Sequence, residues 1–200
     1  MKLAIMTKPT FFVEEDKILT TLFEEGMENL HLRKPESSPI YAERLLSLLS
    51  ENFYRRITVH DHFYLKNEYG LGAIHIDTPN TPLPEGYKGK FSRTCTELCQ
   101  LKDAKKKAEY VFLNVNSNEN NILSSEIISQ ELKNAAKNGM IDKHVYAIGG
   151  MNIDNVKVAK DLGFGGVVIC EDLWERFDIH NEINYKRLIN HFEKLYKAIS

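Results

Sequence analysis

Short apolar runs alternate along the chain with longer segments in which apolar residues recur at helical spacing. The short runs are rich in β-branched and aromatic residues. Eight are predicted to be strands: residues 2–7, 29–33, 56–60, 73–77, 90–94, 110–115, 144–148 and 166–170. Such alternation is typical of repeated βα units with parallel strands. Over the 200 residues it predicts an α/β protein with the (β/α)8 fold of a TIM barrel, as a single domain spanning residues 1–200.

The helical segments carry apolar stripes with a period of about 3.6 residues. One stripe stops before Gly26, another stops at Gly163, and a strongly amphipathic stripe closes the chain over residues 185–199. Glycine commonly follows the last residue of a helix because it readily adopts left-handed backbone angles. The third and fourth units have little room for a helix, since only residues 63–69 and the proline-rich residues 78–86 stand there.

Polar residues follow nearly every predicted strand. They are Lys8, Arg33 with Lys34, His60 with Asp61, Asp77, Ser92 with Arg93, Asn114 with Asn116, Gly149 with Gly150, and Glu171 with Asp172. In parallel α/β proteins the carboxyl ends of the strands meet at one face, and ligands bind there. A strand that simply ends in a polar loop would explain any one of these residues, but the whole set predicts a binding site at one mouth of the barrel.

Charge and composition exclude several classes of function. The formal net charge is -2 with acidic and basic residues interspersed, so no strong field attracts nucleic acid or an anionic membrane. No apolar run reaches the roughly 20 residues of a membrane span, and no signal peptide is evident, so we expect a cytoplasmic protein. Cys95, Cys99 and Cys170 form no metal-binding pattern and are expected to be reduced thiols.

Six short segments then follow one another along the chain. They are His-Leu-Arg-Lys-Pro at 31–35, Thr-Val-His-Asp at 58–61, Ala-Ile-His-Ile-Asp at 73–77, Ser92, Glu-Tyr-Val at 109–111 and Ala-Ile-Gly-Gly-Met at 147–151. In residue type and order they resemble motifs of thiamine phosphate synthase and its relative TenI, a thiazole tautomerase. The resemblance covers roughly residues 1–175 and implies the barrel fold more firmly than the activity.

The resemblance also implies roles for individual residues. The synthase joins a pyrimidine diphosphate to a thiazole phosphate and releases pyrophosphate, which calls for Mg²⁺ and cationic groups. Arg33 matches the family arginine that contacts the diphosphate, and Asp61 matches a metal ligand. The second metal-binding aspartate of the family falls near Asn80, which leaves Asp77 as an off-register substitute. We expect His60 and Asp61 to be the catalytic residues.

A phosphate site is predicted where Gly149 and Gly150 follow a strand and precede a helix. Glycines in such a turn let backbone N–H groups approach an anion. The family uses this turn for the thiazole phosphate. His31, Lys34 and Ser92 are further candidates for binding the substrate.

Several positions depart from the family pattern. Pro35 stands where the family has a lysine, and residues 114–121 replace a family loop that is followed by another lysine. The histidine of TenI in that loop would fall at Val115. Glu171 and Asp172 would repel a phosphate nearby unless they point outward.

Three interpretations follow. In the first, the chain is a thiamine biosynthesis enzyme, and the impaired diphosphate site favours the tautomerase over the synthase. In the second, it is a non-catalytic barrel that binds a thiazole or pyrimidine phosphate as a regulator or carrier. In the third, it is another isomerase that uses His60, Asp61 and Asp77 as acid and base. Small phosphorylated molecules are the expected partners, together with a second copy of the chain in a homodimer.

Overall fold

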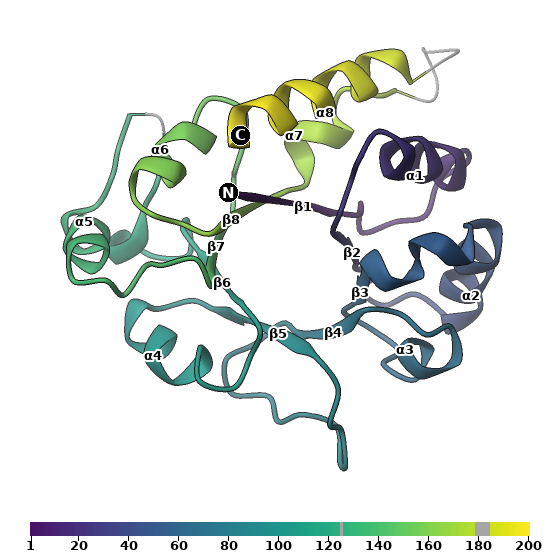
Figure 1. Ribbon diagram of the computed structural model, residues 1–200, viewed down its shortest axis with the longest axis horizontal. Helices are drawn as coiled ribbons and strands as arrows, with labels where there is room; N and C mark the ends of the chain where they lie inside the picture. Colours follow the sequence, from purple (N-terminus) through teal and green to yellow (C-terminus); the bar gives the residue numbers. More distant parts are fainter. Residues whose placement is uncertain (125, 179–184) are drawn as a thin grey trace.

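Eight parallel strands close into a barrel in sequence order, and helices surround it (Figure 1). The computed structural model describes residues 1–124, 126–178 and 185–200. Each predicted strand is present; seven are shorter than predicted by one or two residues, and the fifth is shifted by one residue toward the carboxyl end. The strands are β1 (Lys2–Met6), β2 (Leu30–Leu32), β3 (Ile57–Val59), β4 (Ala73–Ile76), β5 (Phe91–Cys95), β6 (Val111–Asn114), β7 (Val145–Ile148) and β8 (Gly166–Ile169). The predicted (β/α)8 barrel is confirmed.

The helices vary widely in length. The described α-helices are α1 (Glu15–Glu24), α2 (Pro39–Leu48), α3 (Leu65–Glu68), α4 (Leu101–Ala104), α5 (Gln130–Lys137), α6 (Val156–Asp161), α7 (Glu171–Trp174) and α8 (Lys186–Ile199). Short 3-10 helices span Glu51–Arg56, Leu98–Gln100 and Glu119–Asn121. Gly26 and Gly163 follow α1 and α6 with φ of 100° and 88°, as the sequence predicts. The third unit keeps a single helical turn, and the described chain between β4 and β5 contains no helix.

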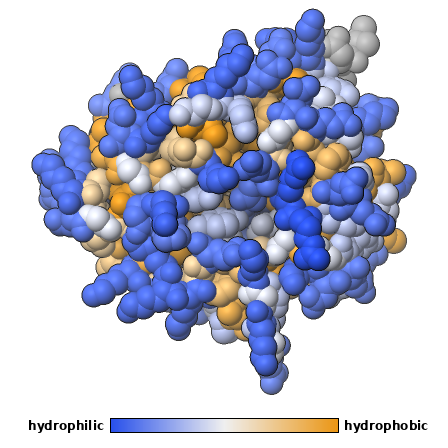
Figure 2. Space-filling view, viewed as in Figure 1, coloured by the Kyte–Doolittle hydropathy of each residue, from blue (hydrophilic) through white to orange (hydrophobic). Residues whose placement is uncertain are grey.

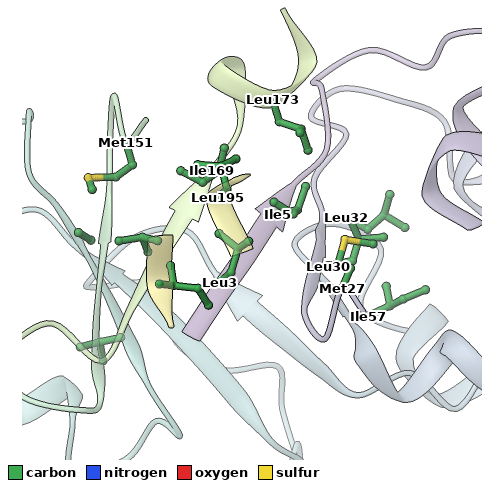
Figure 3. Packing of buried hydrophobic residues seen from close by; sticks show 14 of the residues in the cluster. Leu3, Ile5, Met27, Leu30, Leu32, Ile57, Met151, Ile169, Leu173 and Leu195 are labelled. Carbon is green, nitrogen blue, oxygen red and sulfur yellow. The ribbon is translucent and has the colours of Figure 1, made fainter. Parts of the chain in front are cut away.

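The main hydrophobic core lies between the strands and the helices. Side chains alternate across a strand, so Leu3 and Ile5 of β1 face outward toward this layer. Figure 3 shows them close to Leu195 of α8. Leu188, Phe192 and Leu195 share one face of α8, and all three are buried. Full burial stabilises each such side chain by about 1.5–3 kcal/mol.

The interior of the barrel is divided into an apolar half and a polar half. Phe112 of β6 and Tyr146 of β7 pack against small or flexible side chains of β1 and β8. Gly166 of β8 leaves room for the Tyr146 ring, which a Cβ at that position would strike. Polar side chains fill the opposite half from β2 to β5. They are His31, Thr58, His60, His75 and Ser92, all buried.

The face of the molecule around the barrel mouth seen in Figure 2 is largely polar. Figure 2 shows hydrophilic side chains over most of the face that it presents, with apolar groups scattered between them. In the described parts of the chain, none of the helices combines the length and the apolar character that a membrane span requires. Cys95, Cys99 and Cys170 form no disulfide, in line with the prediction of free thiols.

Candidate active site

The carboxyl-terminal mouth of the barrel gathers four of the predicted site residues. Arg33, Asp61, Asp77 and Gly149 follow β2, β3, β4 and β7, whose carboxyl ends face the same way in this closed parallel barrel. Arg33 Nε donates to Asp77 Oδ2 across 3.0 Å, and both side chains are slightly more than one-third exposed. The predicted clustering at one mouth is therefore confirmed.

Asp77 stands between the mouth and the buried imidazole of His60. Its Oδ1 lies 2.5 Å from His60 Nδ1, and the His60 side chain has no exposed surface. Burial raises the pKa of Asp77, but His60 and Arg33 outweigh this effect and bring the pKa below its usual value. The group that faces the mouth is therefore the ionised Asp77 carboxylate, with His60 behind it.

A chain of hydrogen bonds continues from His60 toward the other end of the barrel. His60 Nε2 lies 2.8 Å from His31 Nδ1, and His31 Nε2 lies 3.0 Å from the Tyr110 hydroxyl. Asn29 Nδ2 donates to that hydroxyl across 3.2 Å. Burial, followed by the proximity of His60, holds the pKa of His31 well below its usual value. His31 therefore lies beneath the mouth as a neutral ring, and its predicted role in substrate binding stays a prediction.

His75 is a second buried imidazole beside this chain. Its ring stacks on that of His60 with centroids 4.2 Å apart and planes inclined by 23°. Nδ1 lies 2.7 Å from Ser92 Oγ, and Nε2 lies 2.8 Å from Thr94 Oγ1. Ser92 thus pairs with His75 inside the barrel, below the mouth. Its predicted contact with a phosphate is untested.

The three histidines form a cluster of the type that can hold a metal ion. Nitrogen atoms of His31, His60 and His75 all lie within 4.8 Å of one another, and imidazole is a common zinc ligand. However, both nitrogens of His75 point to hydroxyls of β5, and its ring lies nearly flat on His60. The lone pairs therefore do not converge on one point, and binding by all three would require the His75 ring to turn.

The predicted Mg²⁺ ligands are already engaged in other bonds. Asp77 uses one oxygen for His60 and the other for Arg33. Asp61 Oδ2 accepts the backbone N–H of Lys34 at 3.0 Å. Mg²⁺ requires several oxygen ligands in near-octahedral geometry. The residues in this arrangement do not fit Mg²⁺, and its use stays a prediction.

Lys34 is buried beside the mouth rather than exposed within it. Its Nζ donates to Glu15 Oε1 at 2.6 Å and to the Thr10 carbonyl at 3.0 Å, and it lies over the Phe11 ring. Burial lowers the pKa of Lys34, while Glu15 acts in the opposite direction. These bonds hold the loop after β1 and the start of α1 against the loop after β2. The predicted contact of Lys34 with a phosphate is untested.

The turn after β7 has the backbone that only glycine adopts easily. Gly149 and Gly150 have φ of 101° and 65°, and a Cβ on Gly149 would clash with the Asn114 side chain. Asn116 Nδ2 donates to the Gly149 carbonyl at 2.9 Å. Among the described residues, the N–H groups of Gly150 and Met151 have no acceptor. Two donors are thus open to a ligand at this turn.

The asparagine-rich loop after β6 is held by its own amides. Asn121 is buried, and its Nδ2 donates to the carbonyls of Asn114 at 2.6 Å and Thr96 at 3.2 Å. Ser117 Oγ also donates to the Thr96 carbonyl. The residues of this loop therefore build a support beside the Gly149 turn.

Neither of the two acidic residues after β8 directs an uncompensated negative charge at this turn. Glu171 is exposed. Asp172 is bonded to His191 Nε2 at 2.7 Å and to Arg176 Nη2 at 2.9 Å. Its Oδ2 also accepts the N–H of Ile153 at 3.3 Å. One acid therefore faces solvent, and the other is held by its bonds to Arg176 and His191.

Two interior residues of this network were not predicted as site residues. His75 lies in β4, two positions before Asp77. Tyr110 lies just before β6, four positions before Asn114. Strand periodicity places residues an even number apart on the same face. That signal would have assigned both to the interior of the barrel.

Solved structures similar to this chain cover it almost completely. Thiamine phosphate pyrophosphorylase from Bacteroides thetaiotaomicron is 46% identical over 99% of this chain and 97% of its own, with a TM-score of 0.89. Thiamine phosphate pyrophosphorylase from Pyrococcus furiosus is 17% identical, with 99% and 95% coverage and a TM-score of 0.74. A 3-hexulose-6-phosphate synthase, at 11% identity, covers 100% of both chains with a TM-score of 0.65. The last two likenesses concern the fold alone.

No family model and no curated protein matches the chain. The 46% identity of the Bacteroides structure to this chain is nevertheless far higher than a shared fold alone would require. The match spans 99% of this chain. The chain therefore belongs to the thiamine phosphate pyrophosphorylase family, the thiamine phosphate synthase/TenI group that its motifs resemble, and has a function of the thiamine biosynthesis type.

Proposed function

We propose that the protein binds a thiazole phosphate and shifts a proton on its ring, as a thiazole tautomerase of the TenI type. The observation that carries this proposal is the bond between Arg33 Nε and Asp77 Oδ2 at 3.0 Å. Condensation would require Arg33 to bind a diphosphate and Asp77 to bind Mg²⁺. Here the two groups neutralise each other, while Asp77 is still presented at the mouth.

In this proposal Asp77 is the base. Its carboxylate is held by His60 on one oxygen and by Arg33 on the other, so its position is fixed before a substrate arrives. A proton transferred by such a positioned group typically contributes about 10²- to 10⁴-fold to a rate. The open N–H groups of Gly150 and Met151 are the proposed donors to the phosphate. His60, predicted as catalytic, would act here through Asp77.

A second candidate is thiamine phosphate synthase itself. It is favoured by the name of the 46% identical Bacteroides relative, thiamine phosphate pyrophosphorylase. Arg33 and Asp61 also occupy the positions at which the family binds diphosphate and metal. In this case the Arg33–Asp77 pair would have to open so that each partner could contact the second substrate.

Two variants separate the candidates. Asp77→Asn should lower tautomerase turnover by about 10²-fold or more, whereas Asp61→Asn, at the same mouth, should change it little. The synthase instead predicts product from a pyrimidine diphosphate and a thiazole phosphate, and a loss of that product in both Asp61→Asn and Asp77→Asn. Both reactions and direct binding of the thiazole phosphate are measured on each protein.

Robust condensation by the unmodified chain would overturn the proposal. Binding without either reaction would favour the non-catalytic carrier. No binding would remove the thiazole phosphate as a ligand.

A further inference from the structure

The Tyr110 hydroxyl lies at the far end of the barrel from the proposed base. Tyr110 immediately precedes β6, so it is at the amino-terminal mouth. With Asn29 it lines a hollow of about 230 Å³ there. Tyr110 is connected to Asp77 through His31 and His60, by bonds of 3.0, 2.8 and 2.5 Å. The chain of bonds thus crosses the interior from one mouth to the other.

Every bond of this chain has a fixed direction. An ionised carboxylate can only accept, so His60 Nδ1 donates to Asp77. A neutral imidazole has one donor and one acceptor, so His60 Nε2 accepts from His31 Nδ1. His31 Nε2 must then accept from the Tyr110 hydroxyl. All the protons therefore point toward Asp77.

We infer that Tyr110 is a positioning residue for Asp77 and fixes the proton of each imidazole from the opposite mouth of the barrel. This inference rests on the proposed role of Asp77 as a base. Without the hydroxyl donor, His31 can carry its proton on Nε2 instead. His31 Nδ1 would then face His60 as an acceptor, His60 would respond by moving its own proton to Nε2, and the bond to Asp77 would be lost.

Tyr146 provides a matched control. Its ring stacks on that of Tyr110 with centroids 4.6 Å apart and planes inclined by 13°. It lines the same hollow but is not a member of the chain from Asn29 to Asp77. Tyr110→Phe and Tyr146→Phe each remove one hydroxyl from this stacked pair, and only the first removes a donor to His31.

The test measures the position of the imidazole protons by ¹⁵N NMR of histidine-labelled protein. In the unmodified protein, His31 and His60 should both carry the proton on Nδ1. Tyr110→Phe should produce a population of His60 protonated on Nε2 and shift the His31 Nε2 resonance. Tyr146→Phe should leave both rings unchanged. A second readout is turnover, where Tyr110→Phe should lower kcat on the order of 10- to 100-fold with KM nearly unchanged.

An Nε2-protonated ring in the unmodified protein would overturn the inference, as would a Tyr110→Phe spectrum identical to that of Tyr146→Phe. Failure of the proposed function has a separate signature. If the unmodified protein lacks tautomerase activity, that function falls, and the NMR measurement alone decides the role of Tyr110. Tyr110→Phe could move the imidazole protons of His31 and His60 and leave kcat unchanged. In that case the chain of hydrogen bonds fixes the imidazole protons without positioning Asp77, and the inference fails.

Discussion

Lowering the pH from about 7.5 to about 5.5 is expected to weaken the fold through the imidazoles inside the barrel. Burial holds the pKa of His31 and of His75 well below the ordinary value of 6.5, and it also lowers that of His60. In the unfolded chain each ring regains that ordinary value. Below it the unfolded chain binds more protons than the folded one. Stability is therefore complete above about pH 6.5 and is lost as the pH falls toward the folded pKa.

The size of the loss follows from the number of rings. A histidine that stays neutral in the folded state but titrates at 6.5 in the unfolded state costs about 1.4 kcal/mol over this interval. His31 and His75 together therefore account for about 3 kcal/mol, and His60 adds to it. Against a typical total stability of about 5–15 kcal/mol, this is a large change.

Urea unfolding at several pH values measures the effect. His75→Gln should reduce the loss between the two pH limits by about 1.4 kcal/mol, whatever its stability at neutral pH. Tyr146→Phe is the control, because it alters a neighbouring interior side chain and keeps all histidines. Burial raises the pKa of Tyr146 to about 12, so it does not titrate in this range. Parallel losses in the unmodified protein and His75→Gln would refute the reasoning, and His31→Gln supplies an independent repeat.

Three further outcomes are expected. Gly149→Ala should destabilise the protein by more than Gly139→Ala in thermal unfolding, because both have positive φ but only Gly149 also lacks room for a Cβ; equal effects would contradict the described turn. Glu15→Gln should cost about 3–5 kcal/mol in urea unfolding, since it leaves Lys34 as a buried unpaired charge; a loss below 1 kcal/mol would place that lysine in solvent. Calorimetry with pyrophosphate should show no gain from Mg²⁺ in the unmodified protein or in Asp61→Asn, and a gain that the variant abolishes would restore the metal site.

The positions of the strands could be predicted because they depend on local patterns. Residues 144–148 and 166–170 are apolar runs between clear breaks, and the structure trims them only at the ends. The helix missing between β4 and β5 was also foreseeable, since prolines disrupt a helix interior. Closure of the barrel followed from the number of units.

The partners of the site residues could not be predicted in the same way. Lys34 and Arg33 are neighbours in sequence, yet one is buried with Glu15 and the other meets Asp77 at the mouth. Which partner each finds depends on packing between loops far apart in the chain. The polar residues that follow the strands indicated which side chains gather at the mouth, but this pattern did not indicate that Asp77 would be held by His60.

The two ends of the described chain meet beside the barrel. The amine of Met1 donates to the carbonyl of Ile199 across 3.3 Å, and Figure 1 marks both ends near β8. A short flexible linker could therefore join residues 1 and 200, and new termini could be opened in the loop of residues 78–86. Such a circularly permuted chain would keep every pair of neighbouring strands. The polypeptide could thus begin at a different βα unit while every unit keeps its place around the barrel.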